Sequence, residues 1–137
     1  MSNFASIRAA LTTKLQGISQ IQAVYDSFTA NFSGFPAVMF EPSGDPSVFG
    51  SNRDNEHIYS FDLYVIQELT TQGRSTSIGS LSDAVDAVVA ALEADPSLSG
   101  ACMYCETMAS SWDEVALPDG PIKYARIIVK CHVVTPY

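Results

Sequence analysis

The chain has 137 residues, of which 47% are hydrophobic, so its length and composition predict one folded domain, residues 1–137, and exclude a disordered chain. Fifteen acidic residues against seven lysines and arginines give a net charge of -8, which argues against proteins that bind nucleic acid or anionic membranes through clustered cations. No segment approaches the ~20 consecutive apolar residues of a transmembrane helix, and residues 1–14 lack a secretory signal pattern, so the sequence predicts folding in the cytoplasm.

The N-terminal third of the chain predicts one helix and two strands. Apolar residues at three- and four-residue spacings predict a helix with Ser2 or Asn3 as its cap and Gly17 as its end. The apolar face of this helix comprises Phe4, Ile7, Leu11, Leu15 and Ile18. Residues 21–25 are too few for a helix and predict a short strand. Residues 36–40 predict a second strand, which begins at a proline because proline lacks a backbone donor.

A long polar stretch follows at residues 41–55, where prolines, glycines and small polar residues recur without the periodicity of a helix or strand. About fifteen residues without secondary structure is long for a compact domain, and such loops are commonly functional or become ordered on a partner. Val48 and Phe49 are apolar residues within this stretch. We therefore expect another protein surface to cover them.

Residues 56–68 predict the clearest strand, because apolar and polar side chains alternate along them. Tyr59, Phe61, Leu63 and Val65 fall on one face. At ~3.3 Å per residue the strand would extend about 40 Å, which is longer than a domain of this size needs for its own sheet. We therefore expect part of the strand to project from the domain.

The C-terminal half predicts a second helix and two more strands. Residues 70–77 predict a polar turn, followed by an amphipathic helix of roughly eighteen residues that ends at residues 95–96. The apolar face of this helix comprises Ile78, Leu81, Val85, Val88 and Leu92. Strands are expected at 101–109 and 123–135, joined by a turn-rich connector at 112–121.

The order of these elements is helix, three strands, helix, two strands, and the last two strands form a predicted hairpin. This order predicts an α+β fold with a mostly antiparallel sheet of four to five strands. Both helices are expected to pack on one face of the sheet, and a long hairpin or loop is expected to project from it.

The cysteines and histidines are the candidates for chemistry. Cys102, Cys105 and Cys131 with His132 could supply four zinc ligands by residue type. In a strand, however, neighbours and residues three apart point to opposite faces, so we expect buried, reduced cysteines instead. Neither His132 nor His57 accompanies a nucleophile motif, and the glycines form no nucleotide-binding pattern. The sequence therefore predicts no catalytic residue, no metal and no cofactor.

Two stretches give the chain a family resemblance. Residues 32–38 read Phe-Ser-Gly-Phe-Pro-Ala-Val before a predicted strand, and residues 55–61 read Asn-Glu-His-Ile-Tyr-Ser-Phe after the polar loop. With Val-Ile-Gln-Glu at residues 65–68, the amphipathic helix and the final strand, they resemble the tail terminator proteins of long-tailed bacteriophages. The resemblance covers almost the whole chain.

This resemblance implies a structural virion protein and not an enzyme. It implies a homohexameric ring that caps the tail tube, ends its polymerisation and offers a docking surface to the head-completion proteins. Genomic DNA would pass through the lumen without specific binding, which suits a negatively charged wall. The protein would assemble in the host cytoplasm and reside in the neck region of the virion tail.

The polar loop supplies the candidate interface. We expect residues 44–53 to contact the adjacent subunit or the tail tube, because this segment is long and contains an apolar Phe49 and a basic Arg53. The candidate interface residues are Gly44, Asp45, Val48, Phe49 and Arg53.

Two alternatives remain open from the sequence. Within the same class, the chain could be another head-to-tail connector, such as a stopper or adaptor, or a tail-tube subunit. From a different class, it could be a small ligand-binding or enzymatic α+β domain. The signature of that class would be a deep pocket containing a histidine or cysteine with a perturbed pKa.

Overall fold

The computed structural model describes residues 4–29, 32–42, 56–69, 73–117 and 120–134. The elements in chain order are α1 (Phe4–Gln16), β1 (Ala23–Tyr25), β2 (Ala37–Pro42), β3 (Glu56–Glu68), α2 (Arg74–Ala94), β4 (Tyr104–Leu117) and β5 (Gly120–Val134). Within the described residues, no helix combines the length and the apolar character needed to cross a membrane.

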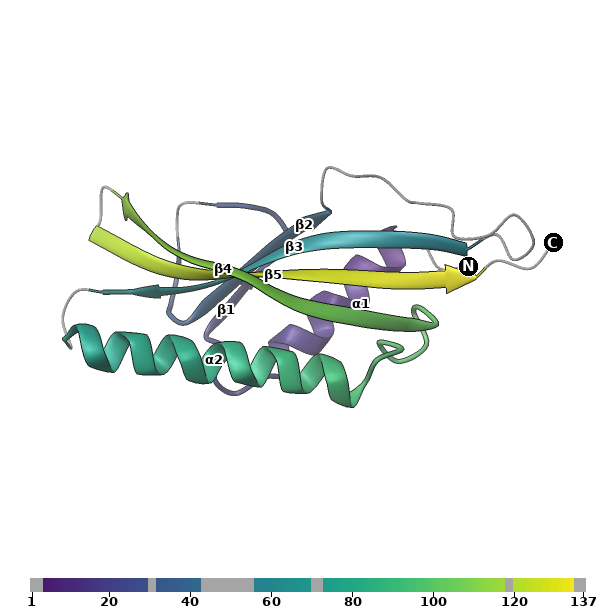
Figure 1. Cartoon of the computed structure of the whole chain (residues 1–137), viewed down its shortest axis with the longest axis horizontal. Helices are drawn as coiled ribbons and strands as arrows, with labels where there is room; N and C mark the ends of the chain where they lie inside the picture. The colour runs from purple at the N-terminus through teal and green to yellow at the C-terminus, as the bar shows by residue number, and fades with distance from the viewer. Residues whose placement is uncertain (1–3, 30–31, 43–55, 70–72, 118–119, 135–137) are drawn as a thin grey trace.

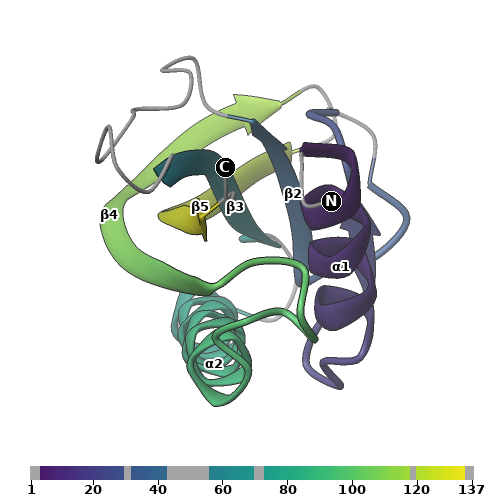
Figure 2. The same cartoon turned by 90° about the vertical axis from the view of Figure 1, so that its right-hand side faces the viewer.

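The strands form one five-stranded sheet in the order β1-β2-β3-β5-β4. β1 runs parallel to β2, and the other three strand pairs are antiparallel. β3, β4, β5 and α2 run along the long axis of the molecule (Figure 1). The view in Figure 2 shows α1 and β4 at opposite sides and α2 below the sheet. The α+β class and the mostly antiparallel sheet are therefore confirmed.

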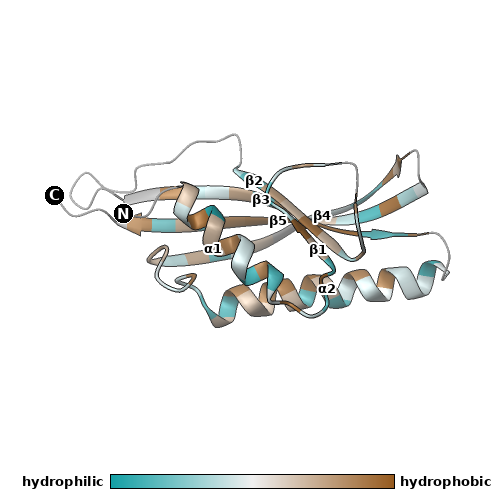
Figure 3. Ribbon diagram, turned by 180° about the vertical axis from the view of Figure 1, so that it is seen from behind, coloured by the Kyte–Doolittle hydropathy of each residue, from teal (hydrophilic) through white to brown (hydrophobic). Residues whose placement is uncertain are grey.

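One hydrophobic core joins both helices to the same face of the sheet. α1 contributes Ile7, Leu11 and Leu15, and α2 contributes residues such as Leu81 and Leu92, all without exposed surface. The sheet contributes alternate residues of its central strands, Phe61, Leu63, Val65, Ile127 and Val129. Apolar and polar segments alternate along the helices and strands in Figure 3, as amphipathic elements require. Both helices therefore pack on one face, as the sequence predicted.

The local sequence correctly predicted the end of α1 but not the start of α2. α1 ends at Gln16 and Gly17 follows it, with the Gly17 amide donating to the Lys14 carbonyl at 3.2 Å. α2 begins at Arg74, four residues before the predicted apolar face, and buries Ser77, whereas Ile78 is only half-buried. Because the first turn of α2 lacks apolar residues, periodicity alone placed its start too late.

The bounds predicted for β3 are correct, and β3 is paired along its whole length. β3 spans Glu56–Glu68, and each of its residues pairs with β5. Phe61, Leu63 and Val65 face the core as predicted. The far part of β3 therefore does not extend alone from the domain, because the neighbouring strand is equally long and satisfies its backbone hydrogen bonds.

The predicted connector at 112–121 was also wrong. β4 continues to Leu117 and β5 begins at Gly120, so most of the connector forms the two arms of a hairpin. Asp113 pairs with Tyr124 and Val115 with Ile122 across the arms. The turn-forming composition was misleading because backbone pairing with β5 determines the conformation of these polar residues.

Two strand boundaries also differ from the prediction. β2 continues through Glu41 and Pro42, which were assigned to the polar loop, because both pair with β3. β4 begins at Tyr104, so Ala101 to Met103 form a turn before the strand. The amide of Met103 donates to the carbonyl of His132 at 2.8 Å and leads the chain into β4.

Candidate interaction surface

The interface residues predicted from the sequence lie outside the described residues. Gly44, Asp45, Val48, Phe49 and Arg53 all belong to residues 43–55. Their role at an interface therefore stays a prediction.

A different candidate surface is the open edge of the sheet at β4. β4 is the last strand in the sheet order and pairs only with β5 within the described residues. Its 14 residues make it far longer than β1, the three-residue strand at the opposite edge. An edge strand of this length presents a row of unpaired backbone donors and acceptors to other chains.

Exposed apolar side chains are concentrated on this edge. Six large hydrophobic residues are exposed among those the structure describes, and five of them lie on β4 or directly before it. These five are Met103, Tyr104, Met108, Trp112 and Val115. In addition, residues 111–116 are all exposed, so the far half of β4 is open to solvent on both faces. Large apolar side chains on an open edge favour protein association.

β4 also lacks the residues that commonly prevent edge association. Lysine and proline on an edge strand discourage pairing with another chain, and β4 contains neither. Its charged residues are the acidic Glu106, Asp113 and Glu114. One irregularity in the register, between Ala109 and Ser111, interrupts the pairing with β5. The edge is therefore apolar and acidic.

An ion-pair cluster fixes the far end of the hairpin to α2. The Arg74 guanidinium contacts the Glu114 carboxylate, and the Lys123 ammonium lies 3.7 Å from the same carboxylate. The hydrogen bond from Arg74, assisted by both positive charges, lowers the pKa of Glu114. Because Arg74 and Glu114 are exposed, water screens their ion pair and it contributes little to global stability.

The outer face of the sheet carries an aromatic cleft. The rings of Phe28, Tyr64 and Tyr124 form a row. Neighbouring rings pack edge to face, with a distance of 5.2 Å between their centroids in each pair. They line a cleft of about 280 Å³ with Met39 and Ile66. The segment at Phe28 crosses this face and explains why Ile66 is buried although it points away from the core. The cleft is apolar and small.

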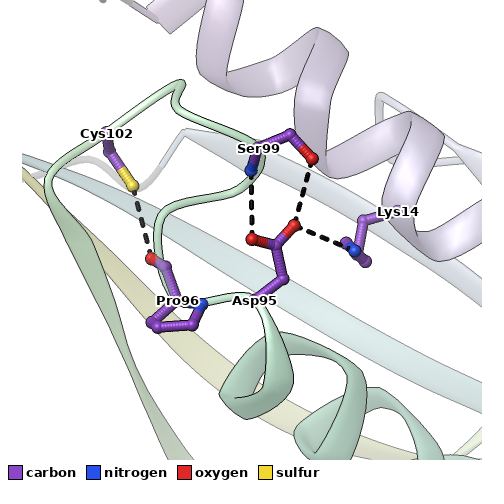
Figure 4. Close-up of polar contacts among 5 residues, drawn as sticks. All are labelled: Lys14, Asp95, Pro96, Ser99 and Cys102. Atoms are coloured by element: carbon purple, nitrogen blue, oxygen red, sulfur yellow. Dashed lines mark hydrogen bonds and ion pairs between the residues drawn. The ribbon is translucent and has the colours of Figure 1, made fainter.

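A second cleft lies between the helices, where one carboxylate connects α1 to the end of α2 (Figure 4). The Lys14 ammonium lies 2.9 Å from Asp95. Ser99 donates to the two oxygens of the same carboxylate from its amide and its hydroxyl, at 3.2 and 3.1 Å. The hydrogen bond from Lys14 is the main cause of the lowered pKa of Asp95. Asp95 is therefore a structural anion.

This cleft of about 870 Å³ is lined mainly by small residues of the two helices and the turn after α2. Neither histidine nor cysteine lines it, and the same is true of the aromatic cleft. The pocket expected of a small enzyme, with a titrating histidine or cysteine inside it, is therefore not found in either cleft.

Two of the three cysteines are buried, as the sequence predicted. Cys102 and Cys131 are buried in the core and Cys105 is half-buried, and all three are free thiols. Cys102 lies in the turn before β4, where its Sγ donates to the Pro96 carbonyl at 3.7 Å (Figure 4). Burial raises the pKa of Cys105 to about 11. No metal-binding group of three histidine, cysteine or acidic residues occurs within the described residues.

Of the two histidines, only His132 has a described side chain. His132 is buried on the outer face, where its ring stacks on Tyr104 at 4.2 Å and its Nε2 lies 3.6 Å from Glu106. Its neighbour Cys131 points into the core, so the two cannot act as nucleophile and base. The side chain of His57 lies outside the described part of the chain.

The comparison with known proteins concerns the fold. A scan against family models and a search of curated proteins find no match. Among solved structures, 28 chains match. One of them comes from a structure described as the virion of a native gene transfer agent particle, with 12% identity and a TM-score of 0.54. The match covers 97% of this chain and 100% of that chain. At this identity it establishes a shared fold over almost the full length of both chains.

Proposed function

We propose that this chain is a structural virion protein of a tailed bacteriophage or phage-like particle. The observation that carries the proposal is the fold it shares with a virion chain over 97% of its own length and the whole of that chain. A long apolar sheet edge supports it, because repeated contacts between protein subunits require such surfaces.

Within that class, the role is that of a tail terminator. Six copies form a ring that caps the tail tube, stops its growth and offers a docking surface to the head-completion proteins. Two features support this role: the sequence resemblance to tail terminators and the acidic composition of the chain. A net charge of -8 limits adhesion of DNA to the wall of the channel through which it passes. The site of action is the neck of the virion, after assembly in the host cytoplasm.

The polymerisation behaviour of the chain separates a terminator from its neighbours in the particle. A tail-tube subunit adds to copies of itself without limit, whereas a terminator stops at one ring. A stopper or adaptor would bind head-completion proteins and leave tube growth unchanged. An enzyme or ligand-binding domain would leave tube growth unchanged, and neither cleft is lined by a histidine or cysteine that such a role could use.

The test is the solution mass of the purified chain by light scattering over a concentration series, repeated after addition of tail-tube subunits. We expect a six-subunit particle, or a monomer that forms a ring on tube ends, and in both cases an arrest of tube growth. Unlimited self-polymerisation would identify a tube subunit instead. A monomer that leaves tube growth unchanged would contradict the terminator role.

A further inference from the structure

β4 is the longer of the two edge strands of the sheet that the structure describes. In an antiparallel edge strand about half of the residues direct their backbone N–H and C=O groups away from the sheet, which is about seven for a strand of this length. Met108 on the outer face is 51% exposed and Val115 on the same face is 40% exposed. A strand that pairs with part of this edge would satisfy the backbone groups there and cover the exposed side chain beside them.

We propose that β4 is the surface by which one copy of this chain binds the next, and that it pairs with the β1 edge of that neighbour to continue the sheet across the interface. This inference rests on the proposed ring and adds which edges form it. The two edges lie at opposite ends of the sheet order, so each copy can use both at once. A contact between two different surfaces closes into a ring when the rotation from one copy to the next completes a full turn, and otherwise it builds an open filament.

Strand direction supports this pairing. β1 and β2 are parallel to each other, and each of the next three pairs in the sheet order is antiparallel, so β4 runs opposite to β1. When a neighbouring copy keeps the same orientation along the sheet, its β1 is therefore antiparallel to β4. Antiparallel pairing is slightly more stable per residue than parallel pairing.

Charge argues against the alternative in which two β4 strands pair with each other. That arrangement would bring the acidic residues Glu106, Asp113 and Glu114 of both copies close together, and like charges across paired strands are destabilising. The β1 edge instead carries one cation and one anion, which form an ion pair, so it is locally neutral. Arg8 of α1 is 48% exposed and lies 4.0 Å from the exposed Asp26, directly after β1. The acidic β4 strand is therefore electrostatically more compatible with the β1 edge than with a second β4 strand.

The first experiment adds positive charge and removes apolar contact on the edge. The double variant Met108→Lys and Val115→Lys of the full chain should fold, because both side chains are exposed. Its matched control is Ala90→Lys, an exposed position on α2 away from both edges. We expect the double variant to require at least about tenfold higher concentration for half-association, with the control unchanged. Equal association of all three chains would overturn the proposal.

The second experiment tests whether two different edges meet. Arg8→Glu should weaken association from the β1 side, while the double variant blocks the β4 side. Mixed in equal amounts, the two variants should form a dimer, because each retains the edge that the other lacks. Association of Arg8→Glu alone at the wild-type level would overturn the β1 contact. Amide hydrogen exchange should also slow along residues 104–117 on association, and unchanged exchange there would contradict the proposal.

These outcomes are separate from those that test the terminator role. If the double variant still arrests tube growth as a six-subunit ring, the β4 contact is wrong and the terminator role stands. If the wild-type chain associates through β4 and leaves tube growth unchanged, the interface stands and the terminator role is wrong.

Discussion

β3 and β4 are almost equally long, with 13 and 14 residues, yet the protein uses them differently. β3 lies between two strands and buries Phe61, Leu63 and Val65 under the helices. β4 pairs on one side only, and its residues 111–116 are all exposed. Position in the sheet order, and not strand length, therefore separates the buried central strand from the exposed edge strand.

Truncating one aromatic side chain in each strand should reveal the largest difference in stability between β3 and β4. Phe61→Ala removes a fully buried ring that packs on Phe40 at a centroid distance of 6.0 Å. We expect a loss of about 3–5 kcal/mol in the free energy of unfolding. Trp112→Ala, the matched change on β4, should change it by less than about 1 kcal/mol because the ring is exposed. Denaturant unfolding of both variants measures the difference, and equal losses would contradict the assignment of β4 as an edge.

The carboxylate between the helices should make stability depend on pH in the acid range. The pKa of Asp95 is lower in the folded chain than its ordinary value of 3.8. Its ionised form therefore stabilises the fold above the unfolded pKa, and this contribution disappears as the pH falls through the folded value. Asp95→Asn should lower the melting temperature at pH 7 and flatten its fall below about pH 4. A parallel pH profile for both chains would show that Asp95 is not responsible.

The equivalent carboxylate at the hairpin should have a smaller effect on stability. Hydrogen bonding from Arg74 lowers the pKa of Glu114, but all of these side chains are exposed. Glu114→Gln should leave the melting temperature nearly unchanged and accelerate amide hydrogen exchange at residues 111–117. Faster exchange throughout the core strands would indicate that the cluster supports the whole fold.

Deleting residues 46–52 should have the smallest effect on folding. We propose that residues 44–53, including Phe49 and Arg53, contact the adjacent subunit or the tail tube. The deletion variant should therefore retain the circular dichroism spectrum and melting temperature of the full chain, yet fail to form rings or to finish tails. Rings and tails formed normally by the variant would refute this role of the loop.

The sequence predicted those features that depend on local patterns. The bounds of β3 and the end of α1 follow from alternation and from Gly17, and both are correct. The start of α2 depends on distant partners, since Arg74 contacts Glu114, which is 40 positions away in the chain. The length of β4 depends in the same way on pairing with β5. Local periodicity contains neither contact, so these boundaries could not be predicted.

The candidate site was less predictable than the fold. Exposed apolar residues on a strand signal an interface only when the strand is known to lie at an edge, and the sheet order does not follow from periodicity. Trp112 could have indicated the surface, because tryptophan is enriched at protein interfaces relative to the rest of the surface. It was instead assigned to a connector, so its position on β4 was missed.

The position of β5 has a consequence for synthesis in the cell. β5 lies between β3 and β4, although it follows both in the chain. Until β5 has been synthesised, β4 has no strand partner and β3 is paired on one side only, with β2. The complete sheet therefore forms only once β5 is available, through contacts between distant segments that are slow to form. A copy of the chain that lacks β5 would therefore also lack the β4 edge.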